Sequence, residues 1–460
     1  MTRAICHGDR QCAQGDETVT VLSSLAELRA PVTVAEIELE EPVTVTTISV
    51  ASPSEDGHAA QAVVLVRLHT MPVGTIVVDA PDGIVDATSC AETAWLSLGT
   101  SLCTHLASDG LPGNPPIARP ADADVPRCQR DLPTTQTPLI SVVVATRERP
   151  RSLAACLDSL ARIDYPDYEI IVVDNDPVTS ATASLVRGRA DENLRYTCEP
   201  RRGLAAAHNR GLEQAKGAIV AFTDDDVILD RKWLNEIAQG FGAAADVACV
   251  TGLLMPAELQ TQAQLLLEAH GHFGKGFEQR LVNCGARRPA DPLFPFTAGK
   301  LGSGANMSFS KDRLCELGGF DPAIGAGTAA RGGDDLAAFF SVLAAGYSLL
   351  YQPTAVAWHR HRRDFASLGN QAYGYGVGLG AYLASALVGH PAMIGPALRG
   401  APAGLRYAFH PASPRNARVS SSWPRDLVWR ERRGLVLGPA AYGVSRLRGL
   451  RPPAPTTAGN

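Results

Sequence analysis

The 460-residue sequence lacks several patterns that mark common classes of protein. No GxGxxG follows the first strand expected after residue 138, and no GxxxxGK[ST] occurs. Neither a dinucleotide-binding fold nor a phosphate-binding loop of the nucleoside triphosphatase kind is therefore supported. No uninterrupted apolar run is long enough to cross a bilayer, and no cationic, apolar signal sequence opens the chain. These absences lead us to expect a cytoplasmic protein.

Cysteine pairs at metal-binding or redox spacing are also missing. The 10 cysteines are dispersed from Cys6 to Cys315 without a CxxC pair, which favours reduced thiols over a disulfide framework or a zinc site. Cys6, His7 and Cys12 form a tight cluster, which we expect to lie in a disordered amino-terminal tail. The net charge of -5 gives no reason to expect a nucleic acid partner.

A proline-rich stretch divides the chain. Residues 111–138 contain seven prolines and few large apolar side chains, which is typical of a linker. Residues 1–110 have alternating apolar and polar positions followed by a helical pattern, which predicts a small accessory α+β module. No chemical constellation is evident in this module, and we interpret His69 and Asp79 as ordinary surface or loop groups.

Strand and helix patterns alternate after the linker. Short apolar, β-branched runs end near residues 145, 173, 197 and 222, and helical patterns separate them. Right-handed crossovers then predict an α/β fold with a mostly parallel sheet and helices on both faces. Because successive parallel strands end at the same edge of the sheet, residues 146–148, 174–176 and 224–226 are expected to converge there.

Three consecutive aspartates, Asp224, Asp225 and Asp226, follow one of these strands. Adjacent carboxylates repel one another, and hard oxygen ligands of this kind suit Mg²⁺ or Mn²⁺. The alternative is that the acids begin a helix predicted over residues 227–240, since carboxylates are favoured in a first helical turn. The residues alone leave both interpretations open.

Six segments stand in a characteristic order: SVVVATRERP (141–150), EIIVVDND (169–176), RRGLAAAHNRGLEQAKGAIVAFTDDD (201–226), GSGANMSFSKDRLCELGGFDPAIGAG (302–327), GGDD (332–335) and AVAWHRH (355–361). In this order they resemble the successive motifs of family 2 glycosyltransferases with the GT-A fold. The resemblance covers about residues 139–375. It implies a nucleoside diphosphate sugar donor, a divalent metal (Mn²⁺ or Mg²⁺) and transfer of the sugar with inversion at the anomeric carbon.

The resemblance also implies roles for individual residues. Asp226 matches the metal-binding aspartate, Asp225 an outer metal or sugar contact, and Asp335 the general base, with Asp334 as a supporting or acceptor contact. The family usually has Glu-Asp at 334–335, and helix capping is the alternative for both acids. The remaining matches are to the nucleotide sugar: Thr146, Arg147, Glu148, Asp174, Asn175, Gly203, Asn209 and Asp224.

Several histidines need separate interpretation. The family usually has arginine where this chain has His208, so no phosphate or ribose role is carried over, and packing against the helix is the simpler interpretation. His359 follows an apolar strand and resembles the histidine that supplies a further metal ligand or a leaving-group contact, of which we favour the ligand; His361 is the less favoured ligand. His270 and His272 lie between glycines, which predicts a mobile loop over the acceptor site.

The last part of the chain, residues 376–460, is predicted to be helical and rich in arginine. Two interpretations are open: contact with an anionic membrane surface, where lipid-linked acceptors reside, or a helical lid on residues 139–375 with a solvated end.

Taken together, the sequence predicts a metal-dependent inverting glycosyltransferase acting on a hydroxyl acceptor, which would be a glycan, a lipid-linked compound or a natural product. Two alternatives stay open: a nucleotidyltransferase acting on a sugar phosphate, and a non-catalytic protein that binds a nucleotide sugar or a partner.

Overall fold

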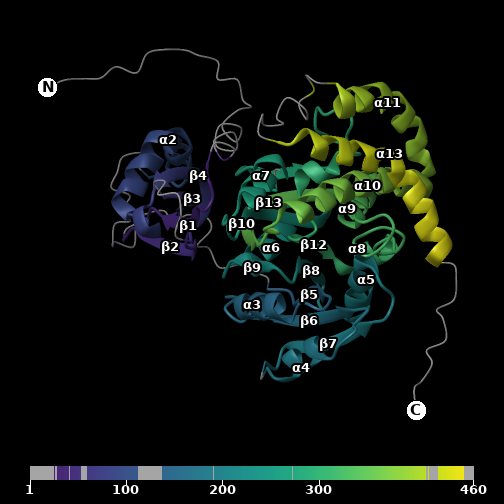
Figure 1. Cartoon of the computed structure of the whole chain (residues 1–460), viewed down its shortest axis with the longest axis horizontal. Coiled ribbons are helices and arrows are strands. Elements are labelled where there is room, and N and C mark those ends of the chain that lie inside the picture. Colours follow the sequence, from purple (N-terminus) through teal and green to yellow (C-terminus); the bar gives the residue numbers. More distant parts are fainter. Residues whose placement is uncertain are drawn as a thin grey trace.

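The computed structural model describes residues 25, 28–40, 42–52, 60–111, 137–189, 191–271, 273–410, 413 and 423–449. The cluster predicted at Cys6, His7 and Cys12, nearly all of the predicted linker, and His272 lie outside these residues. The described part contains a four-stranded sheet, here called the small sheet, and a nine-stranded sheet, here called the large sheet. Figure 1 shows the small sheet with helix α2 on one side of the molecule and the helices of the carboxyl-terminal third on the other.

The small sheet confirms the predicted α+β module. Its strands have the order β2-β1-β3-β4, in which β1 and β3 are parallel and the other neighbours are antiparallel. The elements are β1 (Thr33–Glu38), β2 (Thr44–Ser49), β3 (Gln61–Leu68), β4 (Met71–Asp79), the short helix η1 (Pro81–Gly83) and α2 (Ala87–Ser108).

Both faces of the small sheet are covered. Along β3, Val64 and Val66 pack with Leu102 of α2, whereas Val63 and Leu65 belong to a cluster with residues of the large sheet. Successive side chains of a strand point to opposite faces, so an apolar run such as AVVLVRL predicts burial on both sides. The module is therefore attached to the rest of the protein through an apolar core.

The large sheet is mixed. Its main order is β11-β13-β10-β12-β8-β5-β6-β7, and β9 pairs with β13. The half formed by β8, β5, β6 and β7 is parallel, as predicted, while β12 runs antiparallel between β8 and β10. The strands are β5 (Ile140–Thr146), β6 (Tyr168–Asn175), β7 (Leu194–Glu199), β8 (Ile219–Asp224), β9 (Val227–Leu229), β10 (Val247–Pro256), β11 (Arg280–Val282), β12 (Met307–Ser310) and β13 (Ser348–His359).

Helices pack on both faces of the large sheet, which confirms the predicted α/β fold class. One face is covered by α5 and α9, and the opposite face by α3 and α6. The helices are α3 (Pro150–Leu160), α4 (Ala181–Arg187), α5 (Leu204–Gln214), α6 (Trp233–Gly242), α7 (Gln262–Gly271), η3 (Ala298–Leu301), α8 (Lys311–Glu316), α9 (Asp334–Ala344), α10 (Phe365–Gly389), η4 (Pro391–Met393), α11 (Ile394–Phe409) and α13 (Arg425–Gly449).

One predicted helix begins later than expected. The sequence predicted a helix over residues 227–240, but Val227–Leu229 form strand β9, which pairs antiparallel with the end of β13, and the helix begins at Trp233. Asp224 therefore ends β8, and Asp225 and Asp226 form the turn between β8 and β9. The alternative in which they begin a helix is wrong.

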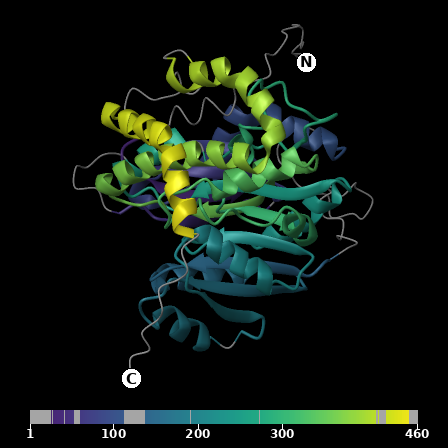
Figure 2. The ribbon, with the colours of Figure 1, turned by 90° about the vertical axis from the view of Figure 1, so that its right-hand side faces the viewer.

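The carboxyl-terminal helices confirm the predicted helical region. Figures 1 and 2 both show α10, α11 and α13 gathered on one side of the large sheet. Glycines allow α10 and α13 to approach closely, because a Cβ atom added at Gly376 would lie 1.9 Å from the carbonyl oxygen of Glu431. Among the described residues, no single helix has the length and composition of a membrane span, but the pair Phe365–Gly389 and Pro391–Phe409, bent by 112°, passes that test.

Candidate active site

A large cleft opens where the parallel strands end. Polar residues that follow β5 and β8 line one part of it, together with the start of α9 and the end of β13. Helices α10, α11 and α13 supply apolar side chains to another part. The predicted convergence is confirmed, because Thr146 is paired with Asp174, Ala145 is paired with Asp224, and the Thr146 hydroxyl donates to Asp225 over 2.6 Å.

The acidic turn at 224–226 meets the end of β13. Asp224, Asp226 and His359 each offer a ligand atom, and these atoms lie within 4.8 Å of one another. The distance from His359 Nε2 to Asp226 Oδ1 is 3.2 Å. The pairing of His359 with Val227 in the β9–β13 ladder places the histidine beside the aspartates. A residue more than 130 positions away in sequence thus completes the cluster.

Arg149 also contacts the acidic turn and was not singled out from the sequence. Its guanidinium group donates to Asp225 Oδ1 over 2.6 Å and to Asp226 Oδ2 over 2.7 Å. Burial acts to raise the pKa of Asp226, but the hydrogen bond and charge of His359 and the charge of Arg149 outweigh it, so the pKa is lowered. Asp225, by contrast, has its pKa raised to about 7, mainly by burial. Asp226 is therefore the aspartate held as an anion.

The residues of this cluster fit a divalent cation. Burial and the charge of Asp226 raise the pKa of Asp224, which means that two close carboxylates are disfavoured without positive charge. His359 Nδ1 is buried and has no hydrogen-bond partner among the described residues. Carboxylate oxygens with an imidazole nitrogen are ligands that Mn²⁺ accepts readily, and the carboxylates also suit Mg²⁺.

Asp335 faces the cleft from the start of α9. Its Oδ2 atom accepts a hydrogen bond from the Gly304 backbone N–H over 2.9 Å, and Oδ1 accepts one from the Leu336 N–H over 2.8 Å. Burial and the neighbouring charge of Asp334 raise the pKa of Asp335 to about 6. The N-cap residue is Gly333, which has no side chain to cap the helix, but Asp335 accepts a hydrogen bond from a first-turn N–H at Leu336. The capping alternative therefore stays open for Asp335, in addition to its place in the cleft.

Asp334 is buried behind Asp335. Its Oδ2 atom lies 3.5 Å from His208 Nδ1, and the His208 ring packs against the rings of Phe222 and Phe320 with centroids 5.0 and 4.9 Å away. His208 is 1% exposed, in agreement with the predicted packing role. Asp334 thus contacts His208 in the protein interior, although both acids line the cleft.

Asp174 lies at the end of β6, where its carboxylate accepts a hydrogen bond from the Tyr196 hydroxyl over 3.1 Å. Burial raises the pKa of Asp174, and its Oδ1 atom has no hydrogen-bond partner among the described residues. A buried, half-satisfied carboxylate at a strand end is suited to accept hydrogen bonds from a ligand.

Other residues predicted to contact the nucleotide support its surroundings. Glu148, which has a φ of 53°, accepts hydrogen bonds from the backbone N–H groups of Val178 and Thr179 and so holds the loop after β6. Asn175 accepts a hydrogen bond from the Gly203 N–H over 2.9 Å and donates to the Arg201 carbonyl over 2.8 Å.

Two further predicted residues lie behind the cleft. Asn209 exchanges two hydrogen bonds of 2.8 Å with the backbone of Phe320. Gly203 begins α5 with a φ of 144°, which suits glycine. The cleft is lined by nine of the predicted residues: Thr146, Arg147, Asn175, Asp224, Asp225, Asp226, Asp334, Asp335 and His359.

The prediction that His270 lies in a mobile loop is wrong, while His272 lies outside the described residues. His270 belongs to the last turn of α7 and stacks on Trp423, with ring centroids 3.8 Å apart. His270 is therefore part of a helix and packs against an indole ring, and it does not belong to a loop. His361, the less favoured metal ligand, is buried and paired with Glu268 at 2.7 Å.

Lys275 lines the cleft and was missed by the sequence analysis. Burial lowers its pKa to about 8, although the negative charge of Asp335 opposes this shift. An amine that stays charged near neutral pH in the same cleft as the carboxylates can receive an anionic group. In the sequence, the surrounding glycines Gly271, Gly274 and Gly276 were the sign that this segment lies over the cleft.

Comparison with known proteins agrees with this arrangement. Residues 141–281 match the family described as Glycosyl transferase family 2. This region is a family 2 glycosyltransferase domain. The match spans β5 to β11 and includes the acidic turn, while Asp335 and His359 lie beyond it.

Curated relatives of the family 2 domain are glycosyltransferases and glycan biosynthesis proteins. Glycosyltransferase AglE of Haloferax volcanii is 34% identical over 107 residues, which are 22% of this chain and 35% of that protein. Succinoglycan biosynthesis protein ExoM of Rhizobium meliloti is 37% identical over 115 residues, 23% of this chain and 37% of that protein. Glucosyl-dolichyl phosphate glucuronosyltransferase of Haloferax volcanii is 25% identical over 189 residues, 40% of this chain and 57% of that protein. The chain therefore spans between a third and about three fifths of the length of these relatives.

Two solved structures resemble this chain with lower sequence identity than these relatives. The mannosyltransferase PcManGT from Pyrobaculum calidifontis, in complex with GDP-Man and Mn²⁺, has a TM-score of 0.43 and 20% identity, covering 69% of this chain and 89% of that chain. GalNAc-T7 with UDP, GalNAc and Mn²⁺ has a TM-score of 0.39 and 15% identity, covering 53% of this chain and 51% of that chain.

Proposed function

We propose that the protein is a metal-dependent, inverting glycosyltransferase that moves a sugar from a nucleoside diphosphate sugar to a hydroxyl group. The observation that carries this proposal is the placement of Asp335, with a pKa raised to about 6, in the same cleft as the cluster of Asp224, Asp226 and His359. Direct displacement of a diphosphate requires a base and positive charge near the leaving group, and the cluster would supply that charge by holding a divalent cation.

The donor is proposed to bind at the ends of β5, β6 and β8. Asp174, with a carboxylate oxygen that has no hydrogen-bond partner among the described residues, would meet the base, and Asp224 the ribose. Asn175, which joins the loop at Arg201 and Gly203 to β6, gives this part of the site a fixed shape. Asp226 and His359 would hold the divalent ion, Mn²⁺ or Mg²⁺, which as a Lewis acid stabilises negative charge on the departing diphosphate.

Asp335 is proposed to take the proton of the acceptor hydroxyl. As the hydroxyl oxygen forms a bond to the anomeric carbon, the bond from that carbon to the diphosphate oxygen breaks, and the electron pair leaves with the diphosphate. Attack opposite the leaving group inverts the configuration, and no covalent intermediate with the enzyme is needed. The two backbone N–H groups on Asp335 fix its orientation, and its pKa near 6 leaves it ionised at neutral pH.

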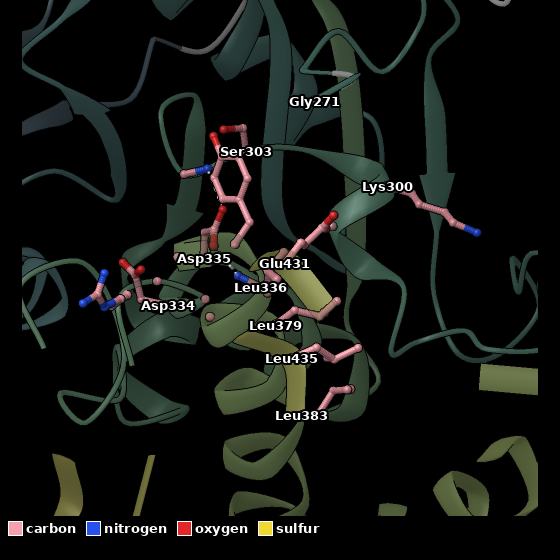
Figure 3. Close-up of a pocket in the computed structure, with 18 of the residues that line it drawn as sticks. Gly271, Lys300, Ser303, Asp334, Asp335, Leu336, Leu379, Leu383, Glu431 and Leu435 are labelled. Carbon is pink, nitrogen blue, oxygen red and sulfur yellow. Dashed lines mark hydrogen bonds between the residues drawn. The ribbon is translucent and has the colours of Figure 1, made fainter. Parts of the chain in front are cut away.

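The acceptor is proposed to have an apolar part. Figure 3 shows Leu379, Leu435 and Leu383 following one another along the pocket next to Asp335 and Glu431. Apolar surface beside the proposed base suits a hydroxyl carried on a lipid-linked compound more than a free, fully polar sugar. One curated relative has glucosyl-dolichyl phosphate in its name, which agrees with such an acceptor.

The carboxyl-terminal helices are proposed to contact an anionic membrane surface from the cytoplasmic side. Leu398 and Leu405 of α11 and Trp429 of α13 are 70%, 62% and 71% exposed. Arginines are frequent on the same two helices, whereas Asp426 and Glu431 are the acids of α13. Apolar side chains interspersed with cations favour the interface of an anionic bilayer.

The proposed domain division is residues 1–110, 111–138, 139–375 and 376–460. Helix α10 continues through residue 375, so the last boundary falls inside one helix.

The decisive experiment is a donor panel. Purified protein is incubated with a set of nucleotide sugars, with and without Mn²⁺ or Mg²⁺, and release of nucleoside diphosphate is measured for the wild type, Asp226→Ala and Asp335→Asn. We expect metal-dependent release from one donor, lost in Asp226→Ala, and a loss of transfer in Asp335→Asn with donor binding retained. Release of pyrophosphate from a sugar phosphate and a nucleoside triphosphate would instead support a nucleotidyltransferase, and donor binding without release in any variant would support a binding protein.

A further inference from the structure

A second cluster of metal-ligating atoms lies in the small-sheet module. His69 Nδ1 is 2.8 Å from Asp109 Oδ2, His105 Nε2 is 3.1 Å from His69 Nδ1, and His105 Nε2 is 3.2 Å from Asp109 Oδ2. The three side chains thus direct one nitrogen or oxygen atom each toward a common point. His69 was predicted to be a surface or loop group, but it is 1% exposed.

The backbone presents these residues from two elements. His105 and Asp109 stand four residues apart at the end of α2, so they lie on one face of that helix. His69 comes from the two-residue turn between β3 and β4. That turn places both His69, with a φ of 52°, and Thr70, with a φ of 64°, in the left-handed region.

The turn at His69 is strained. A β-branched residue such as Thr70 rarely adopts positive φ, so this conformation is unfavourable for the isolated turn. A hydrogen bond of 2.8 Å from the Thr70 N–H to Glu38 Oε2 helps to hold the conformation. Strain of this kind is concentrated at functional sites, where a side chain must be aimed in one direction. Here the conformation aims the His69 ring at the end of α2.

The charge of Asp109 also favours a bound cation. Asp109 is 7% exposed and follows the carboxyl-terminal end of α2, where the helix dipole disfavours a negative charge. Among the described residues, its ion pairs are those with the two histidines. A buried carboxylate at this position is stabilised by a positive charge at the point where the three side chains meet.

Hydrogen bonds alone satisfy the three atoms poorly. If both histidines donate to Asp109 Oδ2, two N–H groups face the same oxygen with their nitrogens 3.1 Å apart. If only one histidine donates, at least one of the three close contacts among these atoms has no proton between its two atoms. Deprotonated imidazole nitrogens around a metal ion remove this conflict, because the ion occupies the position of the shared protons.

We propose that His69, His105 and Asp109 bind a Zn²⁺ ion that ties the β3–β4 turn to the end of α2. Ligand atoms about 2.0 to 2.1 Å from zinc in a tetrahedron are roughly 3.3 Å apart, close to the separations of 2.8 to 3.2 Å found here. Two imidazoles and a carboxylate are ligands that zinc takes readily, and water completes the fourth position. This site is separate from Asp224, Asp226 and His359, and it does not depend on the proposed transferase activity.

Zinc binding to the full-length protein tests the proposal. Metal is removed with a chelator, and Zn²⁺ is added in competition with a chromophoric zinc indicator. All variants are made in an Asp226→Ala background, which removes a ligand of the other candidate site. We expect one equivalent of zinc in this background, and His69→Ala, His105→Ala and Asp109→Asn each to weaken zinc binding by more than about tenfold.

Two controls separate ligand loss from other causes. Cys103→Ala removes an exposed thiol on the same helix, and we expect it to leave zinc binding unchanged. His105→Cys supplies a thiolate at the ligand position, and we expect it to retain zinc within about tenfold of the His105 protein, which a variant that only perturbs folding would not do. Equal zinc affinity in the starting protein and in the His69→Ala and His105→Ala variants would overturn the proposal. So would the loss of all zinc on substitution of Asp226.

Discussion

At the scale of single residues, the environment of Asp335 decides what the cleft can do. The carboxylate keeps two backbone hydrogen bonds, which favour its ionised form, while burial and Asp334 act in the opposite direction and dominate. A base must be ionised to accept a proton and basic enough to hold it. A pKa of about 6 meets both conditions near neutral pH.

We therefore expect transfer to depend on a group that titrates near pH 6. Because the ionised form of Asp335 is the proposed base, kcat/KM should rise as the pH increases through about 6 and reach a plateau above it. Asp335→Asn should lower kcat by about 10² to 10⁴, the range typical of general base catalysis, and abolish this step in the profile. The measurement is the pH dependence of sugar transfer by the wild type and the variant. A profile that keeps its acid limb in Asp335→Asn would assign the titration to another group.

The residues also show where prediction from sequence stops. The three aspartates were visible because they are consecutive, and their convergence with Thr146 and Asp174 follows from the direction of parallel strands. Arg149 belongs to no pattern that signals contact with Asp225 and Asp226. His69 and His105 are separated by 36 residues, and only the strained turn and the packing of α2 bring them together.

At the scale of elements, hydrophobic periodicity predicted the strands β5, β6, β7 and β8 and the helices between them, but not β10 or β11. It failed at Val227–Leu229, because a three-residue apolar run has no period and continues smoothly into the pattern of α6. Pairing with the end of β13, a non-local interaction, determines the strand. The sequence analysis predicted helices rich in arginine over residues 376–460 but not the close contact of α10 with α13, which depends on the spacing of their glycines.

The contact of α10 with α13 gives a prediction about stability. Gly376→Ala would place a Cβ atom 1.9 Å from the Glu431 carbonyl oxygen, so the helices must separate, and we expect a loss of about 1 to 3 kcal/mol in the free energy of unfolding. Gly389→Ala on the same helix is the matched control, since a Cβ atom there meets nothing within 4 Å. Thermal and urea unfolding of both variants would measure the difference. Equal stability of the two would show that α10 and α13 do not pack in this way.

At the scale of the whole molecule, the small sheet is a structural partner of the large one. Leu65 of β3 is fully buried in the cluster that contains Leu253 of β10 and Trp358 of β13. Polar contacts surround this core: Arg67 donates to Asp230 over 2.7 Å, and Gln260 donates to the Ser49 hydroxyl over 3.1 Å. The sequence predicted a separate module, but no sequence pattern indicates which face of the small sheet packs against the large sheet.

This packing predicts a large effect of a single truncation. Leu65→Ala should lower the free energy of unfolding by about 2 to 5 kcal/mol, because a cavity opens between the two sheets. Leu96→Ala in α2 is the control, since Leu96 is 88% exposed and its loss should cost less than about 0.5 kcal/mol. Denaturant unfolding monitored separately by far-ultraviolet circular dichroism and tryptophan fluorescence would test both values. A change in Leu65→Ala no larger than in Leu96→Ala would contradict a shared core.

The last two residues of strand β13 contact different parts of the protein. Trp358 packs in the core shared with the small sheet, and His359, the next residue, joins the acidic turn. A chain that began at residue 139 would therefore leave Val356 and Trp358 without their apolar cover, one residue from the catalytic cleft. Such a fragment would self-associate through the uncovered surface, so dilution and mild detergent, more than added donor or metal, would determine how much of it stays in solution.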